Sequence, residues 1–233
     1  MTDTETIIAE LSALGSEEKA CHLARFFKTG KGQYGEGDRF LGLPVPLTRG
    51  VARRHKDASL AAVEALLQSE WHEARLCALL IMAEKMKRAT AEEAGLIYKT
   101  YLANTRRINN WDLVDLSAPH VVGKYLADKP RGVLYELAAS PLLWDNRIAI
   151  VSTFAFIKAK DLDDTFRLAL LLMNHTHDLM HKAVGWMLRE AGKRDMARLR
   201  AFVYEHVHRM PRTMLRYAIE KFPEDERRAV LKM

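Results

Sequence analysis

The chain has 233 residues, of which 48% are hydrophobic and 28% are charged, and its formal net charge is +6 at pH 7. This composition is typical of a soluble globular protein and excludes a disordered or fibrous one. No apolar run approaches the ~18 residues of a membrane span, and the polar start does not resemble a signal peptide. We therefore expect no membrane partner and a cytoplasmic location, in a bacterial cytosol or nucleoid. The positive charge favours polyanionic partners only modestly.

Cysteine and histidine spacing gives little support for a metal site. Cys21 and Cys77 lack the spacing of metal ligands and are interpreted as ordinary thiols. His177 and His181 are four residues apart, but they have no HExxH context and no obvious carboxylate or cysteine companion. We predict no metal and no cofactor.

Helical periodicity runs through almost the whole chain. Residues 2–28 form two apolar stripes separated at Gly15, and residues 28–46, with five glycines and two prolines, form a loop without the order of a phosphate-binding P-loop. No segment shows the alternation of a strand, so the sequence predicts an all-α protein with a single domain over residues 1–233. The further helices are expected at 47–55, 57–68, 70–87, 90–103, 110–126, 130–139, 142–158, 161–173, 177–192, 195–208 and 211–221.

A repeat is visible in the second half of the chain. Arg147, Lys182 and Arg216 each precede small and aliphatic residues inside a predicted helix, and they are spaced 35 and 34 residues apart; Arg75 resembles an earlier member. This period, with two helices per unit, predicts an α-solenoid of HEAT-like repeats, since the tetratricopeptide pattern is absent. Equivalent positions would line a concave basic groove suited to a phosphate backbone, although each cation is equally well explained as a solvated charge.

One predicted helix places a carboxylate on an apolar face. Asn109 or Asn110 is suited to cap a helix that starts near Trp111. Asp115 then shares a face with aromatic and aliphatic residues, whereas Asp112 and Ser117 point elsewhere. Asp115 either forms an interhelix salt bridge or a cap, or it lies beside an aromatic wall and meets a cation. The shared face consists of Trp111, Val114, Asp115 and Ala118.

Two later helices also combine aromatic and cationic residues. Arg147 lies three residues after Trp144, and its guanidinium could pair with Asp115 or grip a phosphate. Trp186 follows a glycine and neighbours Lys182 and Arg189 at helical spacings, where a core position is an equally good explanation.

These segments together carry a family resemblance. Asn110 to Asp115, Trp144 to Ile150 and Lys182 to Glu190 resemble the three signature segments of the AlkD-like DNA alkylation repair family. Tyr34 to Pro46 is similar to the family's N-terminal loop, and Met210 to Glu220 to its C-terminal helix. The resemblance spans nearly the whole chain, with the segments in the family's order. The loop departs from the pattern, because residues 42–46 offer no amide side chain for a groove contact.

The resemblance implies a HEAT-like-repeat DNA glycosylase of base excision repair. It would excise cationic N3- and N7-alkylpurines, such as 3-methyladenine and 7-methylguanine, from duplex DNA without metal or cofactor. It would not need to flip the damaged base into a pocket, unlike most glycosylases. Asp115 matches the family's catalytic carboxylate, Trp111 and Trp186 its aromatic walls, and Arg147 its cleft arginine. Further candidates for DNA contacts are Lys182, Arg189, Arg212 and Arg216.

The chemistry of such a substrate agrees with a single carboxylate. A purine alkylated at N3 or N7 already carries positive charge and leaves without a general acid, so the second carboxylate of sugar hydrolases is not needed. Asp115 would stabilise the oxocarbenium-like sugar and orient the attacking water, and Trp111 and Trp186 would add cation–π attraction. The alternative is a catalytically inactive HEAT-like solenoid that binds DNA structures or protein partners. We expect a monomer in either case.

Overall fold

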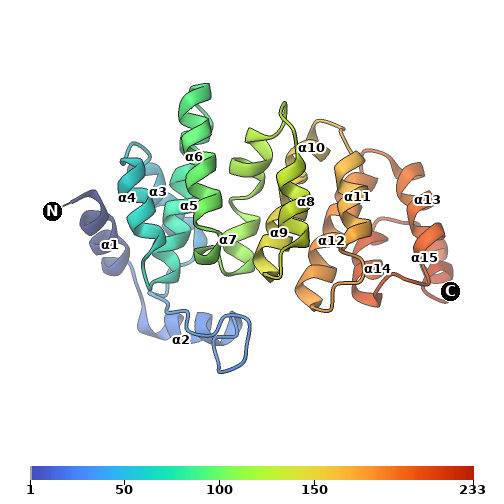
Figure 1. Cartoon of the computed structure of the whole chain (residues 1–233). Helices are drawn as coiled ribbons and strands as arrows, with labels where there is room; N and C mark the ends of the chain where they lie inside the picture. The colour runs from blue at the N-terminus through green and yellow to red at the C-terminus, as the bar shows by residue number, and fades with distance from the viewer. Residues whose placement is uncertain (1) are drawn as a thin grey trace. The chain divides into compact units, whose positions relative to one another are not determined.

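The computed structural model describes residues 2–233, which contain helices and a single isolated bridge but no β-strand (Figure 1). The prediction of an all-α protein is confirmed, and helices packed in succession are compatible with HEAT-like repeats. The chain divides into two compact units, Met1–Tyr125 and Leu126–Met233. No helix within residues 2–233 has both the length and the apolar character needed to cross a membrane.

The helices follow one another through short connections, apart from the loop between α2 and α3. Unit 1 contains α1 (Asp3–Ala13), α2 (Glu17–Phe26), α3 (Val45–Arg54), α4 (Leu60–Leu67), α5 (His72–Met86), α6 (Ala91–Ala103), η1 (Thr105–Arg107), α7 (Trp111–Asp115) and the π-helical turn η2 (Pro119–Gly123). Unit 2 contains α8 (Gly132–Ala139), α9 (Leu143–Ser152), α10 (Phe154–Lys158), α11 (Asp163–Leu171), α12 (Asp178–Gly192), α13 (Met196–His206), α14 (Arg212–Ala218) and α15 (Glu224–Val230).

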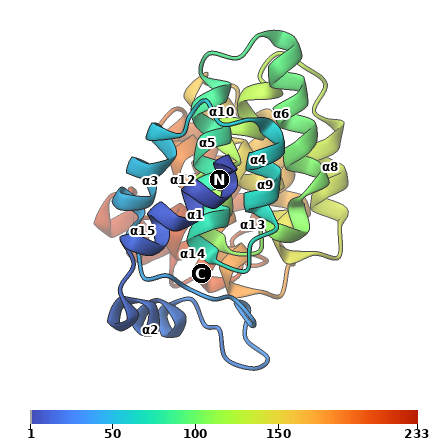
Figure 2. The same ribbon diagram turned by 90° about the vertical axis from the view of Figure 1, so that its left-hand side faces the viewer.

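Helix α5 is the core of unit 1. Nearly all of its residues are buried, and it packs against α1, α3, α4, α6 and α7. Helix α2 and the loop after it lie across one end of these helices instead of alongside them (Figures 1 and 2). They therefore cover the N-terminal ends of α5 and α7, where Phe27 contacts both His72 and Trp111.

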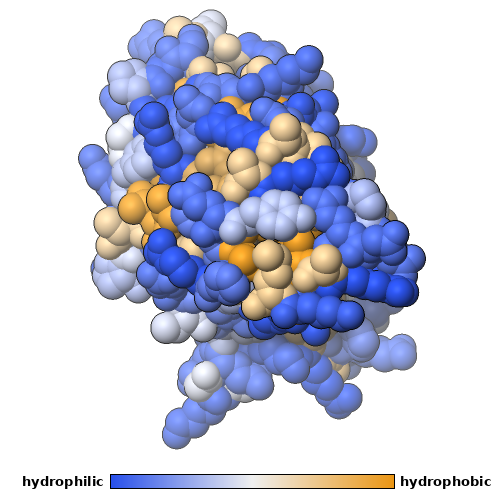
Figure 3. Space-filling view, turned by 90° about the vertical axis from the view of Figure 1, so that its right-hand side faces the viewer, coloured by the Kyte–Doolittle hydropathy of each residue, from blue (hydrophilic) through white to orange (hydrophobic). Residues whose placement is uncertain are grey.

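In unit 2, α12 occupies the central position and packs against α9, α11, α13 and α14. Its closest neighbour is α14, because Gly185 brings the two backbones together: a Cβ added at Gly185 would lie 2.5 Å from the Met214 carbonyl oxygen and 2.6 Å from the Tyr217 Cβ. The surface over the C-terminal helices of this unit is mostly hydrophilic with small apolar patches (Figure 3).

We expect Gly185→Ala to destabilise unit 2 by about 1–3 kcal/mol, because the new methyl group meets backbone that must move. Urea denaturation followed by circular dichroism measures the change. Gly132→Ala is the matched control, since nothing lies within 4 Å of its added Cβ, and it should be neutral or stabilising by up to about 1 kcal/mol. Equal stability of the two variants would contradict the close approach of α12 and α14.

Two predicted helices are interrupted in the structure, and one helix of the structure was not predicted. The helix expected over 110–126 is interrupted after Asp115, because Pro119 lacks the N–H that a continuous helix would use there. The helix expected over 142–158 is divided at Thr153 into α9 and α10. Helix α15, which begins after Pro223, was not predicted.

Candidate active site

The first turn of α7 is set by a side-chain cap. Asn110 has an extended backbone, and its side-chain oxygen accepts a hydrogen bond from the Trp111 N–H at 2.9 Å. This satisfies one of the N–H groups that a helix leaves unpaired at its start. Trp111 and Asp115 are both half-buried, one turn apart, while Val114 and Ala118 are fully buried. The predicted apolar face therefore exists, and its two functional candidates lie at its accessible edge.

Trp111 and Asp115 line a pocket of about 360 Å³ within unit 1. Its other walls come from α2, the following loop, the start of α3, and α5. These walls are mainly apolar side chains, among them Phe26, Phe40 and Leu43. Asp115 is thus a carboxylate at a largely apolar cavity, an environment in which its charge interacts strongly with any cation that approaches.

Aromatic rings form a continuous cluster beside this pocket. Phe27 stacks on Trp111 with ring centroids 5.2 Å apart and an interplanar angle of 23°. Phe40 stacks on Phe27 and on the His72 ring, with ring centroids 5.2 and 4.6 Å away. One face of the Trp111 indole is therefore packed against protein, which restricts the orientation of this ring.

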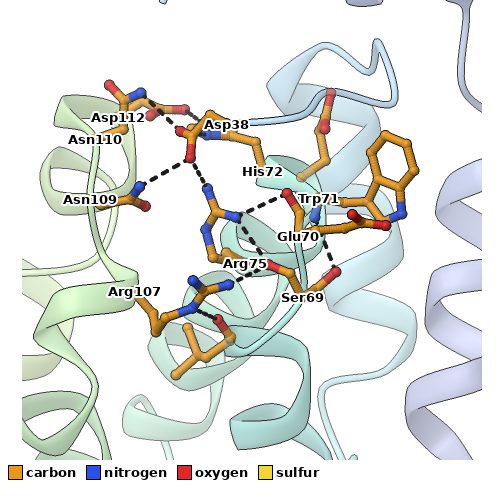
Figure 4. Close-up of polar contacts among 12 residues, drawn as sticks. Asp38, Ser69, Glu70, Trp71, His72, Arg75, Arg107, Asn109, Asn110 and Asp112 are labelled. Atoms are coloured by element: carbon orange, nitrogen blue, oxygen red, sulfur yellow. Dashed lines mark hydrogen bonds and ion pairs between the residues drawn. The ribbon is translucent and has the colours of Figure 1, made fainter. Parts of the chain in front are cut away.

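A buried charge network lies between Asp38 of the loop, His72 and Arg75 of α5, and the start of α7 (Figure 4). The His72 ring contacts two carboxylates, with Nε2 2.8 Å from Asp112 and Nδ1 3.2 Å from Asp38. The Arg75 guanidinium donates to the other oxygen of Asp38 at 2.6 Å, and the Asn109 amide donates to the same atom at 3.0 Å. The network joins the loop, α5 and the start of α7, and both carboxylates and both cations are at most 9% exposed.

The network shifts the titration of its members. Burial by itself would lower the pKa of His72, but the charge of Asp112 and the hydrogen bonds to both carboxylates outweigh it and raise the pKa to about 9. Burial would raise the pKa of Asp38, yet the hydrogen bond from His72 and the charges of Arg75 and His72 lower it to about 2. At neutral pH the network therefore holds an imidazolium and a guanidinium between two carboxylates.

The loop is also held by the carboxylate of Glu73. One oxygen accepts hydrogen bonds from the Gly42 and Leu43 N–H groups at 2.9 and 3.1 Å, and the other accepts from the Leu41 N–H at 2.9 Å. Gly42 has a φ of 87°, and a Cβ there would lie 2.0 Å from the Ser16 carbonyl oxygen. The loop predicted over residues 28–46 therefore contains a position where only glycine fits.

The remaining catalytic candidates belong to unit 2. Arg147 on α9 is buried, and its guanidinium donates to the Leu179 carbonyl oxygen at 2.6 Å. Trp186 on α12 is half-buried, and its ring lies 5.9 Å from that of Phe154. Both side chains are therefore held in defined positions within unit 2, whereas Trp111 and Asp115 belong to unit 1.

The predicted DNA-contacting cations differ in their surroundings. Lys182 pairs with Asp178 at 2.8 Å, and the Arg212 guanidinium donates to the Leu231 carbonyl oxygen at 2.7 Å. Arg216 is exposed, and Arg189 pairs with Glu190 and Glu220. Arg75, interpreted as an early member of the cation repeat, is only 2% exposed and pairs with Asp38, so its charge neutralises a buried carboxylate and does not face a groove.

Sequence reasoning missed the network altogether. The sequence analysis predicted that the Asp112 side chain points away from the apolar face of Asp115, but it did not predict that Asp112 is 4% exposed and paired with His72. Asp38, His72 and Glu73 received no role. The partners are 30 to 72 residues apart, and no local spacing in the sequence indicates such pairs. Asp38, one of two acidic residues in the glycine-rich loop, was the one available signal.

Comparison with known proteins places the chain in a family. A family model described as DNA alkylation repair enzyme matches residues 7–222. The structure is similar to that of a predicted DNA alkylation repair enzyme from Enterococcus faecalis, with a TM-score of 0.69 and 17% identity over 90% of this chain and 97% of the other. No curated protein matches the sequence significantly. Because the family model spans most of its length, the chain belongs to the family of DNA alkylation repair enzymes.

Proposed function

We propose that the protein is a DNA glycosylase that hydrolyses the N-glycosidic bond of cationic N3- and N7-alkylpurines in duplex DNA. The observation that carries this proposal is the position of Asp115, a half-buried carboxylate one helical turn from Trp111 at the wall of a largely apolar pocket. A carboxylate in such a setting stabilises a nearby positive charge more strongly than one in water.

In the proposed reaction, the bond between C1′ and the purine nitrogen breaks, and its electron pair neutralises the charged base. The deoxyribose becomes an oxocarbenium-like cation, which Asp115 stabilises electrostatically. A water oriented by Asp115 attacks C1′, and its proton passes to the carboxylate. Trp111 and Trp186 contribute cation–π attraction toward the sugar. No general acid is needed, because the alkyl group already gives the leaving base the positive charge that protonation would supply.

Cations of unit 2 are proposed to hold the duplex. Lys182, Arg189, Arg212 and Arg216 would contact phosphates, and Arg147 would grip a phosphate as well. Such contacts release counterions, so the affinity for duplex DNA should fall steeply with salt concentration.

The decisive experiment measures base release from a duplex that carries a single 7-methylguanine or 3-methyladenine. We expect release of the free base and an abasic site, with the same rate in the presence of EDTA. Unmodified duplex should be bound but not cut. Salt-dependent binding without any release would instead favour a non-enzymatic helical scaffold.

A further inference from the structure

His72 is connected to α7 by two independent routes. Its Nε2 pairs directly with Asp112, the second residue of α7. Its ring also lies 5.0 Å from Phe27, which stacks on Trp111, the first residue of the same helix. Asp115 follows Asp112 by three residues, so a movement of the first turn of α7 changes the position of both Trp111 and Asp115.

Helix α7 depends on such contacts because it is very short. It has five residues, its first backbone hydrogen bond joins the Val114 N–H to the Asn110 carbonyl at 3.2 Å, and an irregular turn separates it from η2. An isolated helical turn is unstable in water, since the conformational entropy lost on nucleation outweighs the stabilisation from one or two hydrogen bonds. The orientation of α7 is therefore determined by what packs against it, and His72 is its buried charged neighbour.

The network is an expensive way to fill this space. Four charged side chains are removed from water, and within the described residues the Oδ1 atom of Asp112 is buried without a hydrogen-bond partner. Apolar side chains of similar volume often stabilise a protein as well as a buried ion pair, or better. Unlike apolar contacts, ion pairs are directional, because each one holds a particular nitrogen atom next to a particular oxygen atom.

We propose that His72 is a positioning residue which, held between Asp38 and Asp112, fixes α7 in the orientation that presents Asp115 and Trp111 to the substrate. The inference rests on the proposed glycosylase function. His72 itself is 2% exposed, so in this proposal it acts through α7 and not by contact with DNA.

This role makes the site sensitive to alkaline pH. The charged groups that face His72 are Asp38 from the loop, Asp112 from α7 and Arg75 from α5. As the pH rises through about 9, His72 loses its proton, and two carboxylates are left with Arg75 alone. The tie between α5 and α7 then weakens. The sign follows from the raised pKa: the contribution of the His72 charge to stability is complete below the ordinary pKa of 6.5 and is lost as the pH rises through about 9.

The wild-type protein provides the first test. We measure the single-turnover excision rate and the Trp111 indole ¹H–¹⁵N resonance, assigned with Trp111→Phe, between pH 6 and 10. Both should change with the same midpoint near 9, while the protein stays folded by circular dichroism. In Asp112→Asn, His72 has lost a carboxylate, so the midpoint should move to lower pH. Titration of the DNA itself is the same for both proteins and cannot produce this difference.

A variant at His72 provides the second test. His72→Gln should lower the single-turnover rate on the order of 10–10²-fold at unchanged DNA affinity, because a small displacement of the carboxylate is enough, and it should remove the alkaline midpoint. His55→Gln is the matched control. His55 also pairs with a carboxylate in unit 1, at 2.7 Å from Glu10, but it lies on the segment between α3 and α4, so rate and midpoint should stay unchanged.

The two proposals fail in different ways. If the wild-type protein releases no alkylated base, the proposed function is wrong, while the Trp111 resonance still reports whether His72 holds α7. If excision occurs but the midpoint is the same in wild type, Asp112→Asn and His72→Gln, the positioning role is refuted. A rate per folded molecule that is unchanged in folded His72→Gln would refute it as well.

Discussion

Replacing Asp115 with asparagine should lower the single-turnover rate of 7-methylguanine excision by about 10²–10³-fold while affinity for the duplex persists. Asparagine has nearly the same size, but it carries no charge with which to stabilise the oxocarbenium-like sugar and is a poor acceptor for the proton of the attacking water. Because Asp115 is half-buried at the wall of a largely apolar pocket, little solvent screens the interaction that is lost. Rapid-quench kinetics at saturating protein measures the rate, and a filter-binding titration measures the affinity.

The control for this experiment is Asp57→Asn. Asp57 belongs to the same unit, and its side chain is 74% exposed and pairs with Arg88 at the surface. Its replacement should leave excision within experimental error of wild type. Unchanged excision by Asp115→Asn would exclude this carboxylate from the reaction, and a parallel loss of DNA affinity would assign it to binding instead.

Replacing Asp38 with asparagine should destabilise unit 1 by about 3–5 kcal/mol. The change leaves His72 and Arg75, both buried, with Asp112 as the one remaining carboxylate of the network. Urea denaturation at pH 7, followed by circular dichroism, measures the effect. The matched control is Glu70→Gln: Glu70 pairs with Arg39 next to the network, but both side chains are more than half exposed, so this change should cost about 0–1 kcal/mol.

Acid adds a second signature to the Asp38 prediction. The pKa of Asp38 is lowered from 3.8 to about 2, so its contribution to stability is present above pH 3.8 and is lost as the pH falls through about 2. Wild-type stability should therefore decline in this range more steeply than that of Asp38→Asn. Equal slopes would mean that the Asp38 carboxylate is not paired in the folded protein.

Much of the fold follows from local patterns. Apolar residues at helical spacing and residues that cap helices, such as Thr90, identify where most helices begin. The helix interruptions at Thr153 and before Pro119 were not predicted. Apolar residues continue at helical spacing across both places, so the periodicity of the sequence does not reveal an irregular turn. Asp115 and Trp111 could be singled out for a related reason: a carboxylate on an apolar face stands out in a one-dimensional pattern.

The support beneath the site could not be predicted in this way. His72 and Asp112 are separated by 40 residues, and each looks like an ordinary polar residue near the start of a helix. Their pairing depends on how α5 and α7 pack and on a loop that brings Asp38 to the same point. Charge pairs of this kind depend on the tertiary structure, and the sequence pattern of a single helix does not predict them.

The two anchors of the glycine-rich loop are consecutive residues of one helix. His72 binds Asp38, and Glu73 binds the backbone of residues 41–43. The length of the loop from residue 38 to residue 43 is therefore fixed by the first turn of α5. With one residue more or fewer in this stretch, His72 and Glu73 could not both make their contacts. Natural relatives that share these anchors should therefore vary in loop length only before Asp38, where residues 30–37 are mostly exposed.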